Sequence, residues 1–102
     1  MVLRHESVVE RLAAEAIRHG ADALEVEYKG GCEEVFAVKN GIGHAIARFA
    51  SSSPEAVSLR NELYGVTRRT RRMTVGECEY ELRGRVYDSF GEDAFRVELR
   101  RV

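Results

Sequence analysis

The residues best suited to chemistry form an arginine-rich run in the second half of the chain. Between positions 60 and 72 there are five arginines and a single acid, Glu62. The arginines are Arg60, Arg68, Arg69, Arg71 and Arg72. Guanidinium groups bind phosphates, and each such contact adds affinity that salt weakens. No aromatic side chains interleave with the cluster at 68–72, so we expect phosphate contacts without base stacking.

A structural interpretation of the same arginines is open as well. Arg68 and Arg69 fall where a helix is expected to end, and cations there complement the helix dipole. Arg71 and Arg72 would flank a strand. The whole chain carries 16 Lys+Arg against 17 Asp+Glu, a net charge of −1. That balance excludes a dedicated nucleic-acid binder or a polybasic membrane protein, so a polyanion contact would be weak and local.

The histidines lack the spacing of a metal site. A catalytic zinc needs about three clustered protein ligands, whereas His5, His19 and His44 are scattered. His5-Glu6 resembles the start of a His-Glu-x-x-His helix, but the second ligand position is Val9. The sequence therefore predicts no metal, no cofactor and no catalytic constellation.

The two cysteines, Cys32 and Cys78, lack a Cys-x-x-Cys spacing. Two thiols without metal spacing favour a reducing compartment, and we expect a cytoplasmic protein. A disulfide between them stays open, because only coordinates can decide it. If the chain is an enzyme, its best residues are Cys32, His44 and the neighbouring glycines.

Gly20-Ala21 after the first predicted helix and Lys39-Asn40-Gly41-Ile42-Gly43 after the first hairpin form a recognisable pattern. Residues 8–43 resemble the opening of the Bergerat-type ATPases, the gyrase and mismatch-repair kind. The resemblance implies a magnesium-binding asparagine on the helix and an adenine-binding aspartate before the glycines. Those positions fall on Glu15 and Lys39, and a lysine cannot accept the adenine hydrogen bond. We therefore expect at most a nucleotide-binding remnant.

The first half of the chain predicts a helix followed by three strands. Ser7 and Glu10 have capping-box spacing, and apolar residues recur at helical intervals to give a helix near 7–19. Strict alternation over 24–29 predicts a strand, Gly30-Gly31 a turn, and residues 35–38 a second strand. Asn40-Gly41 is a strong hairpin signal. Residues 42–50 would be a third strand, with a helix over 43–50 as the competing prediction.

The second half repeats this order. Ser53 as N-cap and Pro54 at the first helical position begin a helix that should end near Arg68 or Arg69. A short strand starts at Met73, and a long hairpin follows. Its predicted register pairs Val86 with Phe95, Leu82 with Leu99, Arg83 with Glu98 and Glu81 with Arg100, because a two-residue shift would oppose like charges. Residues 88–93 are left for the loop.

The chain is expected to be a single α+β domain over 1–102, in the order αβββαβββ. We expect a mainly antiparallel sheet with both helices packed on one face. No apolar run approaches the roughly 20 residues that cross a membrane. The predicted function is a non-enzymatic module that binds a protein partner or forms a homodimer. The alternatives are a weak nucleic-acid or polyanion binder through 68–72, and a small enzyme or nucleotide-binding remnant.

Overall fold

The computed structural model describes residues 7–102 of the chain. Its elements, in chain order, are α1 (Val8–Arg18), β1 (Ala23–Lys29), β2 (Cys32–Lys39), β3 (Ile42–Ala50), α2 (Pro54–Arg68), β4 (Arg71–Val75), β5 (Cys78–Ser89) and β6 (Glu92–Arg101). The α+β class predicted from the sequence is confirmed. Residues 42–50 are a strand, so the competing helix prediction was wrong.

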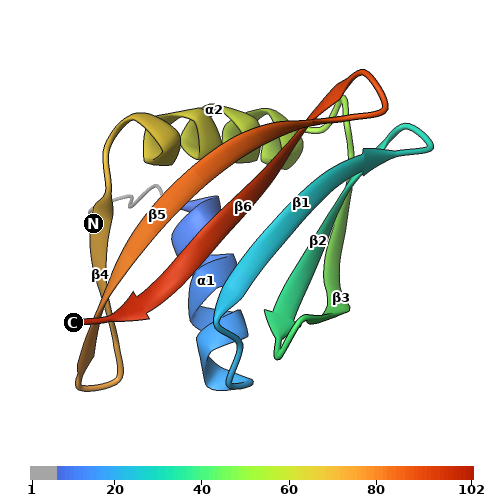
Figure 1. Cartoon of the computed structure of the whole chain (residues 1–102). Coiled ribbons are helices and arrows are strands. Elements are labelled where there is room, and N and C mark those ends of the chain that lie inside the picture. Colours follow the sequence, from blue (N-terminus) through green and yellow to red (C-terminus); the bar gives the residue numbers. More distant parts are fainter. Residues whose placement is uncertain (1–6) are drawn as a thin grey trace, which may run out of the picture.

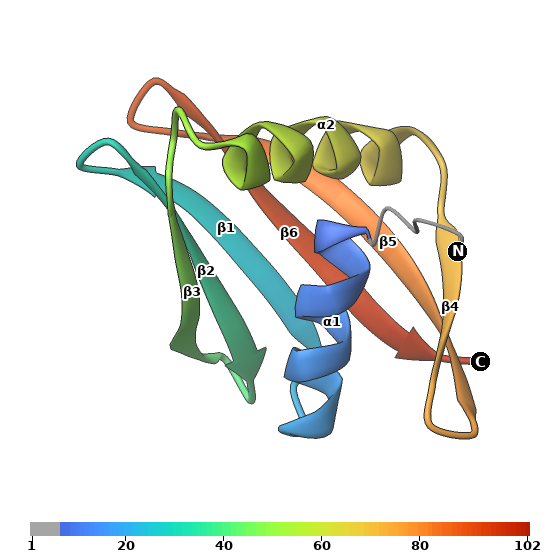
Figure 2. The same cartoon turned by 180° about the vertical axis from the view of Figure 1, so that it is seen from behind.

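The strands form one antiparallel sheet in the order β3-β2-β1-β6-β5-β4. The first and last strands in sequence among the six, β1 and β6, are neighbours at its centre, which joins the two halves of the chain. The sheet curls, and both helices lie against the same face of it (Figures 1 and 2). The opposite face of the sheet is free of helices, and we call it the outer face.

Capping residues define where each helix begins. The Ser7 hydroxyl accepts a hydrogen bond from the Glu10 amide, and the Ser53 hydroxyl accepts one from the Ala56 amide. Each bond satisfies one of the amides that a helix N-terminus leaves without a partner. Pro54 fits the first position of α2 because it has no amide hydrogen to satisfy.

The core lies between the helices and the strand residues that alternate toward them. The most deeply buried large side chains are Phe95, Leu24, Leu59, Leu63, Leu82, Val9, Val26, Val35 and Val97. They come from both helices and from β1, β2, β5 and β6. Within residues 7–102, no helix is long and apolar enough to cross a membrane.

The predicted register of the last hairpin is confirmed in all four pairs. The predicted loop over 88–93 was too long. Asp88 pairs with Asp93 and Ser89 with Glu92, which leaves a two-residue turn of Phe90 and Gly91. The hairpin therefore keeps its strand pairing to the tip.

Gly84 lies at a close approach of α2 to the sheet. A Cβ at this position would lie 3.0 Å from the Thr67 backbone nitrogen and 3.1 Å from the Val66 carbonyl carbon. Both atoms are backbone, so neither can move without shifting the helix. Gly84 thus lets the last turn of α2 rest directly on β5.

Replacing Gly84 should therefore destabilise the fold, and Gly65 provides the matched control. We expect Gly84→Ala to lower the free energy of unfolding by about 2 kcal/mol, because the methyl group overpacks the helix contact. Gly65 lies inside α2 with nothing within 4 Å of its added Cβ. Gly65→Ala should raise the free energy of unfolding by about 0.5 to 1 kcal/mol. Urea denaturation measures both, and equal effects would contradict the close approach.

Candidate functional site

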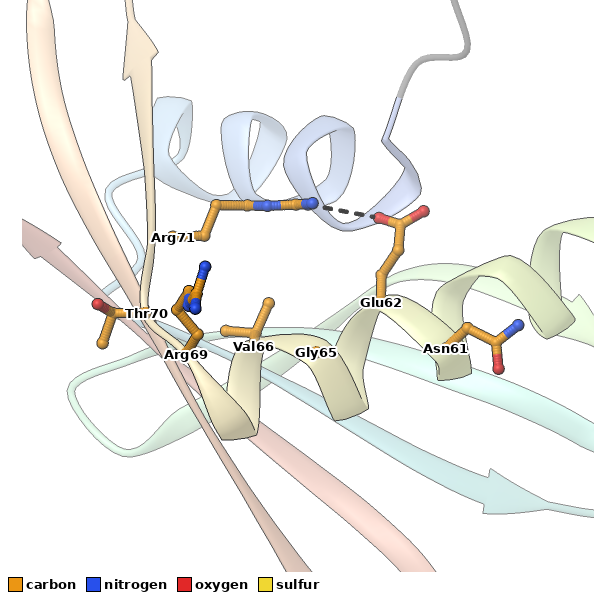
Figure 3. Close-up of a pocket in the computed structure, with 7 residues that line it drawn as sticks. All are labelled: Asn61, Glu62, Gly65, Val66, Arg69, Thr70 and Arg71. Atoms are coloured by element: carbon orange, nitrogen blue, oxygen red, sulfur yellow. Dashed lines mark ion pairs between the residues drawn. The ribbon is translucent and has the colours of Figure 1, made fainter.

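Arg71 lies inside a polar network where α1, α2 and β4 meet. Its guanidinium donates to the Ser7 hydroxyl at 3.0 Å and lies 3.4 Å from a Glu10 carboxylate oxygen. It also lies 3.8 Å from a carboxylate oxygen of Glu62, toward which it extends from β4 (Figure 3). Two carboxylates therefore compensate its charge, which reduces its availability for an external phosphate.

Glu62 is the centre of this network. Its carboxylate accepts hydrogen bonds from the Val9 amide at 3.0 Å, from the Val8 amide at 3.2 Å, and from the Ser7 hydroxyl. The second half of the expected capping box, from the Glu10 carboxylate to the Ser7 backbone, is not among the hydrogen bonds of residues 7–102. A carboxylate from α2 supplies the missing acceptors instead, and a negative charge also suits the positive end of the α1 dipole.

A hollow of about 380 Å³ lies beside this network (Figure 3). It is lined by Asn61, Glu62, Gly65, Val66, Arg69, Thr70 and Arg71. Arg69 is the lining cation that has no ion pair among the described residues. The hollow is therefore mixed in charge and offers one free guanidinium.

The structure separates the other arginines of the predicted site. Arg72 points to the outer face and pairs with Glu79 at 2.8 Å. Arg60, on the second turn of α2, lies 3.4 Å from the buried carboxylate of Glu33. Arg68 is exposed at the end of α2, like Arg69. Three of the five guanidiniums thus have carboxylate partners, and the pair Arg68–Arg69 remains available.

Cys32 and His44, the residues of the enzyme hypothesis, lie on opposite faces of the sheet. His44 pairs with Ala37, whose buried side chain belongs to the core. Cys32 is five residues from Ala37 along β2, so alternation directs it to the outer face. There Cys32 raises the pKa of the neighbouring Arg48 guanidinium. Cys32 and His44 therefore do not form a thiol–imidazole pair in this fold.

The two cysteines are also separated. Cys78 pairs with Val75 at the tip of the β4–β5 hairpin, whereas Cys32 pairs with Lys29 near the tip of the β1–β2 hairpin. Both are free thiols. The disulfide that the sequence left open is therefore not formed in this fold.

An exposed aromatic side chain that was not predicted from the sequence lies at the tip of the β5–β6 hairpin. Phe90 is fully exposed and has a φ of 53°, and Gly91 follows with a φ of 82°. The tip lies next to that of the β1–β2 hairpin in both views of the fold (Figures 1 and 2). Tyr28, 43% exposed, is at that second tip. The dipeptide Phe-Gly between two alternating segments was the available signal for this turn.

Two hollows flank Tyr28. One, of about 320 Å³, includes Tyr28, Phe36 and Phe90 in its lining. The other, of about 360 Å³, includes Tyr28, Tyr64 and Asp93. Tyr64 donates a hydrogen bond to the Asp93 carboxylate, which raises the pKa of the Tyr64 hydroxyl. The hairpin tips therefore combine exposed aromatic rings with adjacent concave surface.

The second hollow also contains the one charged side chain that is buried among the described residues. Glu33 is only 3% exposed. It accepts a hydrogen bond from the Ser51 hydroxyl at 2.7 Å and faces the Arg60 guanidinium at 3.4 Å. A buried carboxylate needs such partners to remain charged. Glu33 thereby links the start of β2 to the β3–α2 connection and to α2.

Neither comparison with known proteins found a relative. No protein-family model matches the chain, and no curated protein matches it significantly. Within residues 7–102, no group of three or more His, Cys, Asp or Glu side chains is arranged to hold a metal.

Removing the Glu62 carboxylate should destabilise the junction of α1, α2 and β4. We expect Glu62→Ala to lower the free energy of unfolding by about 2 kcal/mol, because it leaves the first α1 amides without their charged acceptor. Glu62→Gln keeps one acceptor oxygen and should show a smaller loss. Glu77→Ala, in the exposed β4–β5 turn, is the control. Equal losses for Glu62→Ala and Glu77→Ala in urea denaturation would contradict the capping role.

Proposed function

We propose that this chain is a non-enzymatic protein-interaction module that docks through the tip of its β5–β6 hairpin. The observation that carries the proposal is Phe90, a large apolar side chain that is fully exposed at a positive φ. We infer a cytoplasmic setting as part of the same proposal, because both cysteines are free thiols.

Phenylalanine is an unfavourable residue at position 90, because the turn there requires a positive φ. A type I′ turn requires a positive φ at both central residues and favours Asn-Gly. The β2–β3 turn of this same chain follows that preference, with Asn40 at 52° and Gly41 at 79°. A bulky residue in the left-handed region costs about 1 to 2 kcal/mol. Contacts within the chain do not offset this conformational cost, because the Phe90 ring is fully exposed.

A partner that buries the ring would offset that strain. Removing a phenylalanine side chain from water contributes about 1.5 to 3 kcal/mol, and aromatic residues are common anchors at interfaces. The hollow beside Phe90, lined in part by Tyr28 and Phe36, would accept an apolar side chain in return. The tip therefore offers both a projecting ring and a receiving surface.

The charges around the tip indicate the kind of partner. Acidic side chains on the two hairpins predominate over basic ones there. The acids are Glu27, Glu34, Asp88, Glu92 and Asp93. The neighbouring cations are Lys29, Arg48 opposite Glu34, and Arg60, which lines the hollow beside Glu92 and Asp93 and is already paired with Glu33. An apolar pocket rimmed by basic side chains would match this surface, since complementary potentials favour association.

Replacing Phe90 with asparagine, the residue that such a turn favours, should relieve the backbone strain at the tip and weaken docking. We expect Phe90→Asn to raise the free energy of unfolding by about 1 kcal/mol, since it removes the steric conflict. The reverse change in the matched turn, Asn40→Phe, should lower it by a similar amount. Urea denaturation of both variants tests the strain, and a destabilised Phe90→Asn variant would contradict it.

Photo-crosslinking in the cells of origin tests docking itself. Phe90→p-benzoylphenylalanine keeps an aromatic ring at the tip, and irradiation should give a discrete adduct. The same residue at Val57, exposed on α2, is the control and should give none. An adduct of twice the chain mass would identify a second copy as the partner. Absence of an adduct at position 90, or equal adducts at both positions, would contradict the proposal.

A second candidate function is a polyanion contact through Arg68 and Arg69. Both are exposed and have no ion pair among residues 7–102. They lie at the C-terminal end of α2, where the dipole attracts cations and gives them a structural role as well.

Binding of a short labelled DNA duplex distinguishes these roles. If Arg68 and Arg69 contact phosphates, anisotropy should show binding at about 50 mM salt that is largely lost at about 200 mM. The double variant Arg68→Gln/Arg69→Gln should weaken it about tenfold or more. Arg83→Gln/Arg85→Gln, on the outer face, makes the same change in net charge and should have little effect. No binding at the lower salt concentration would remove this candidate.

A further inference from the structure

A fourth hollow lies beyond the C-terminal end of α1, away from the hairpin tips. It has a volume of about 520 Å³ and is bordered by β2 and β3. Its lining consists of His19, Ala21, Ala37, Lys39, His44, Ala45 and Ile46. It exceeds the hollow beside Arg71, which has about 380 Å³.

Lysine and histidine are concentrated at this hollow. Lysine and histidine are rare in this chain, which has two lysines and three histidines but fourteen arginines. His19, His44 and Lys39 all line this one hollow, and no acid or arginine is among its lining residues. An ammonium and two imidazoles are hydrogen-bond donors suited to an anion. The lining of this hollow thus contains basic side chains and no acidic ones, whereas the hollow at Arg71 contains both.

The remaining wall is apolar and made of small residues. Ala21, Ala37 and Ala45 leave space that larger side chains would fill, and Ile46 adds an apolar surface. The hollow arises because α1 ends at Arg18 and the chain turns away at Gly20, whose φ is 80°. The exposed part of β3 near His44 is therefore left without a covering helix.

A β-bulge directs successive residues of β3 toward the hollow. Ala45 pairs with Phe36 and Ala47 with Val35, so Ile46 is the extra residue between them. In a regular strand, neighbouring side chains point to opposite faces. Here His44, Ala45 and Ile46 all line the hollow. Bulges commonly redirect side chains beside binding sites.

Lys39 is held at the rim by its contact with the end of α1. Its ammonium nitrogen would be 3.3 Å from a Cβ added at Gly20, so the side chain lies against the glycine that ends the helix. The Lys39 ammonium therefore lies at the end of α1, on the border of a hollow that His19 and His44 also line. The arrangement is a cationic rim above an apolar wall.

We propose that this hollow binds a small organic carboxylate with an apolar body. The Lys39 ammonium pairs with the carboxylate, and the imidazoles of His19 and His44 donate hydrogen bonds to it. The apolar body packs against the alanines and Ile46. This site is independent of the docking function assigned to Phe90.

The surroundings favour a monoanion over a phosphate dianion. The site has one ammonium, and it lacks the arginine forks and helix N-terminal amides that typically hold phosphate. The nearby helix end is a C-terminus, whose partial negative charge disfavours a dianion more strongly than a monoanion. One carboxylate is therefore the better match.

Titration of isotope-labelled protein with octanoate, followed by amide chemical shifts, tests the proposal. Octanoate should cause saturable shifts at the lining residues, whereas octanol, acetate and inorganic phosphate should bind at least about tenfold more weakly. No saturation by octanoate up to about 10 mM, or tighter binding of phosphate, would overturn the proposal. So would shifts that centre on the hairpin tips.

Variants separate a charge-selective site from general apolar binding. Lys39→Gln should weaken octanoate binding about tenfold, the loss of one charge-assisted hydrogen bond. Lys29→Gln removes the other lysine of the chain, at the opposite end of β1–β2, and should leave binding within about twofold. Ala45→Leu keeps every charge and should weaken binding by filling the hollow. Equal affinities for Lys39→Gln and the parent protein would overturn the assignment.

Discussion

The carboxylate of Glu62 is the contact on which the arrangement of the two halves depends. It lies in the middle of α2 yet satisfies the amides at the start of α1, and Arg71 of β4 is placed beside it. Leaving those amides buried without an acceptor would cost about 1 to 3 kcal/mol. The position of α1 over the sheet therefore depends on α2. Arg71, one arginine of the cluster, is paired with carboxylates at the same junction.

The alternation of side chains along strands determines what the arginines can do. Adjacent residues of β4 point to opposite faces, so Arg71 joins the helix junction while Arg72 pairs with Glu79 on the outer face. Arginines that are clustered in the sequence thus have separate carboxylate partners in the folded chain. The same rule places Cys32 and His44 on opposite faces of the sheet.

The docking proposal and the carboxylate-binding proposal both rest on departures from local regularity. Phe90 contradicts the preference of its turn, and the bulge at Ile46 interrupts the alternation of β3. Proteins retain such departures where a surface must be presented in a particular way. They lie in different parts of the molecule, one at the hairpin tips and the other beyond the end of α1. A macromolecular surface and a small-molecule site can therefore coexist without sharing residues.

Local patterns in the sequence determined the order of elements, both helix caps and the register of the last hairpin. These depend on contacts between near neighbours or on one pair of adjacent strands, where alternation and charge leave a single acceptable match. The tertiary structure alone decided that β1 and β6 are central neighbours, that Glu62 caps α1 and that His19, Lys39 and His44 meet. β1 and β6, Glu62 and α1, and His19 and the β2–β3 hairpin that carries Lys39 and His44 are each far apart in the chain. No local pattern specifies which distant partners the folded core brings together.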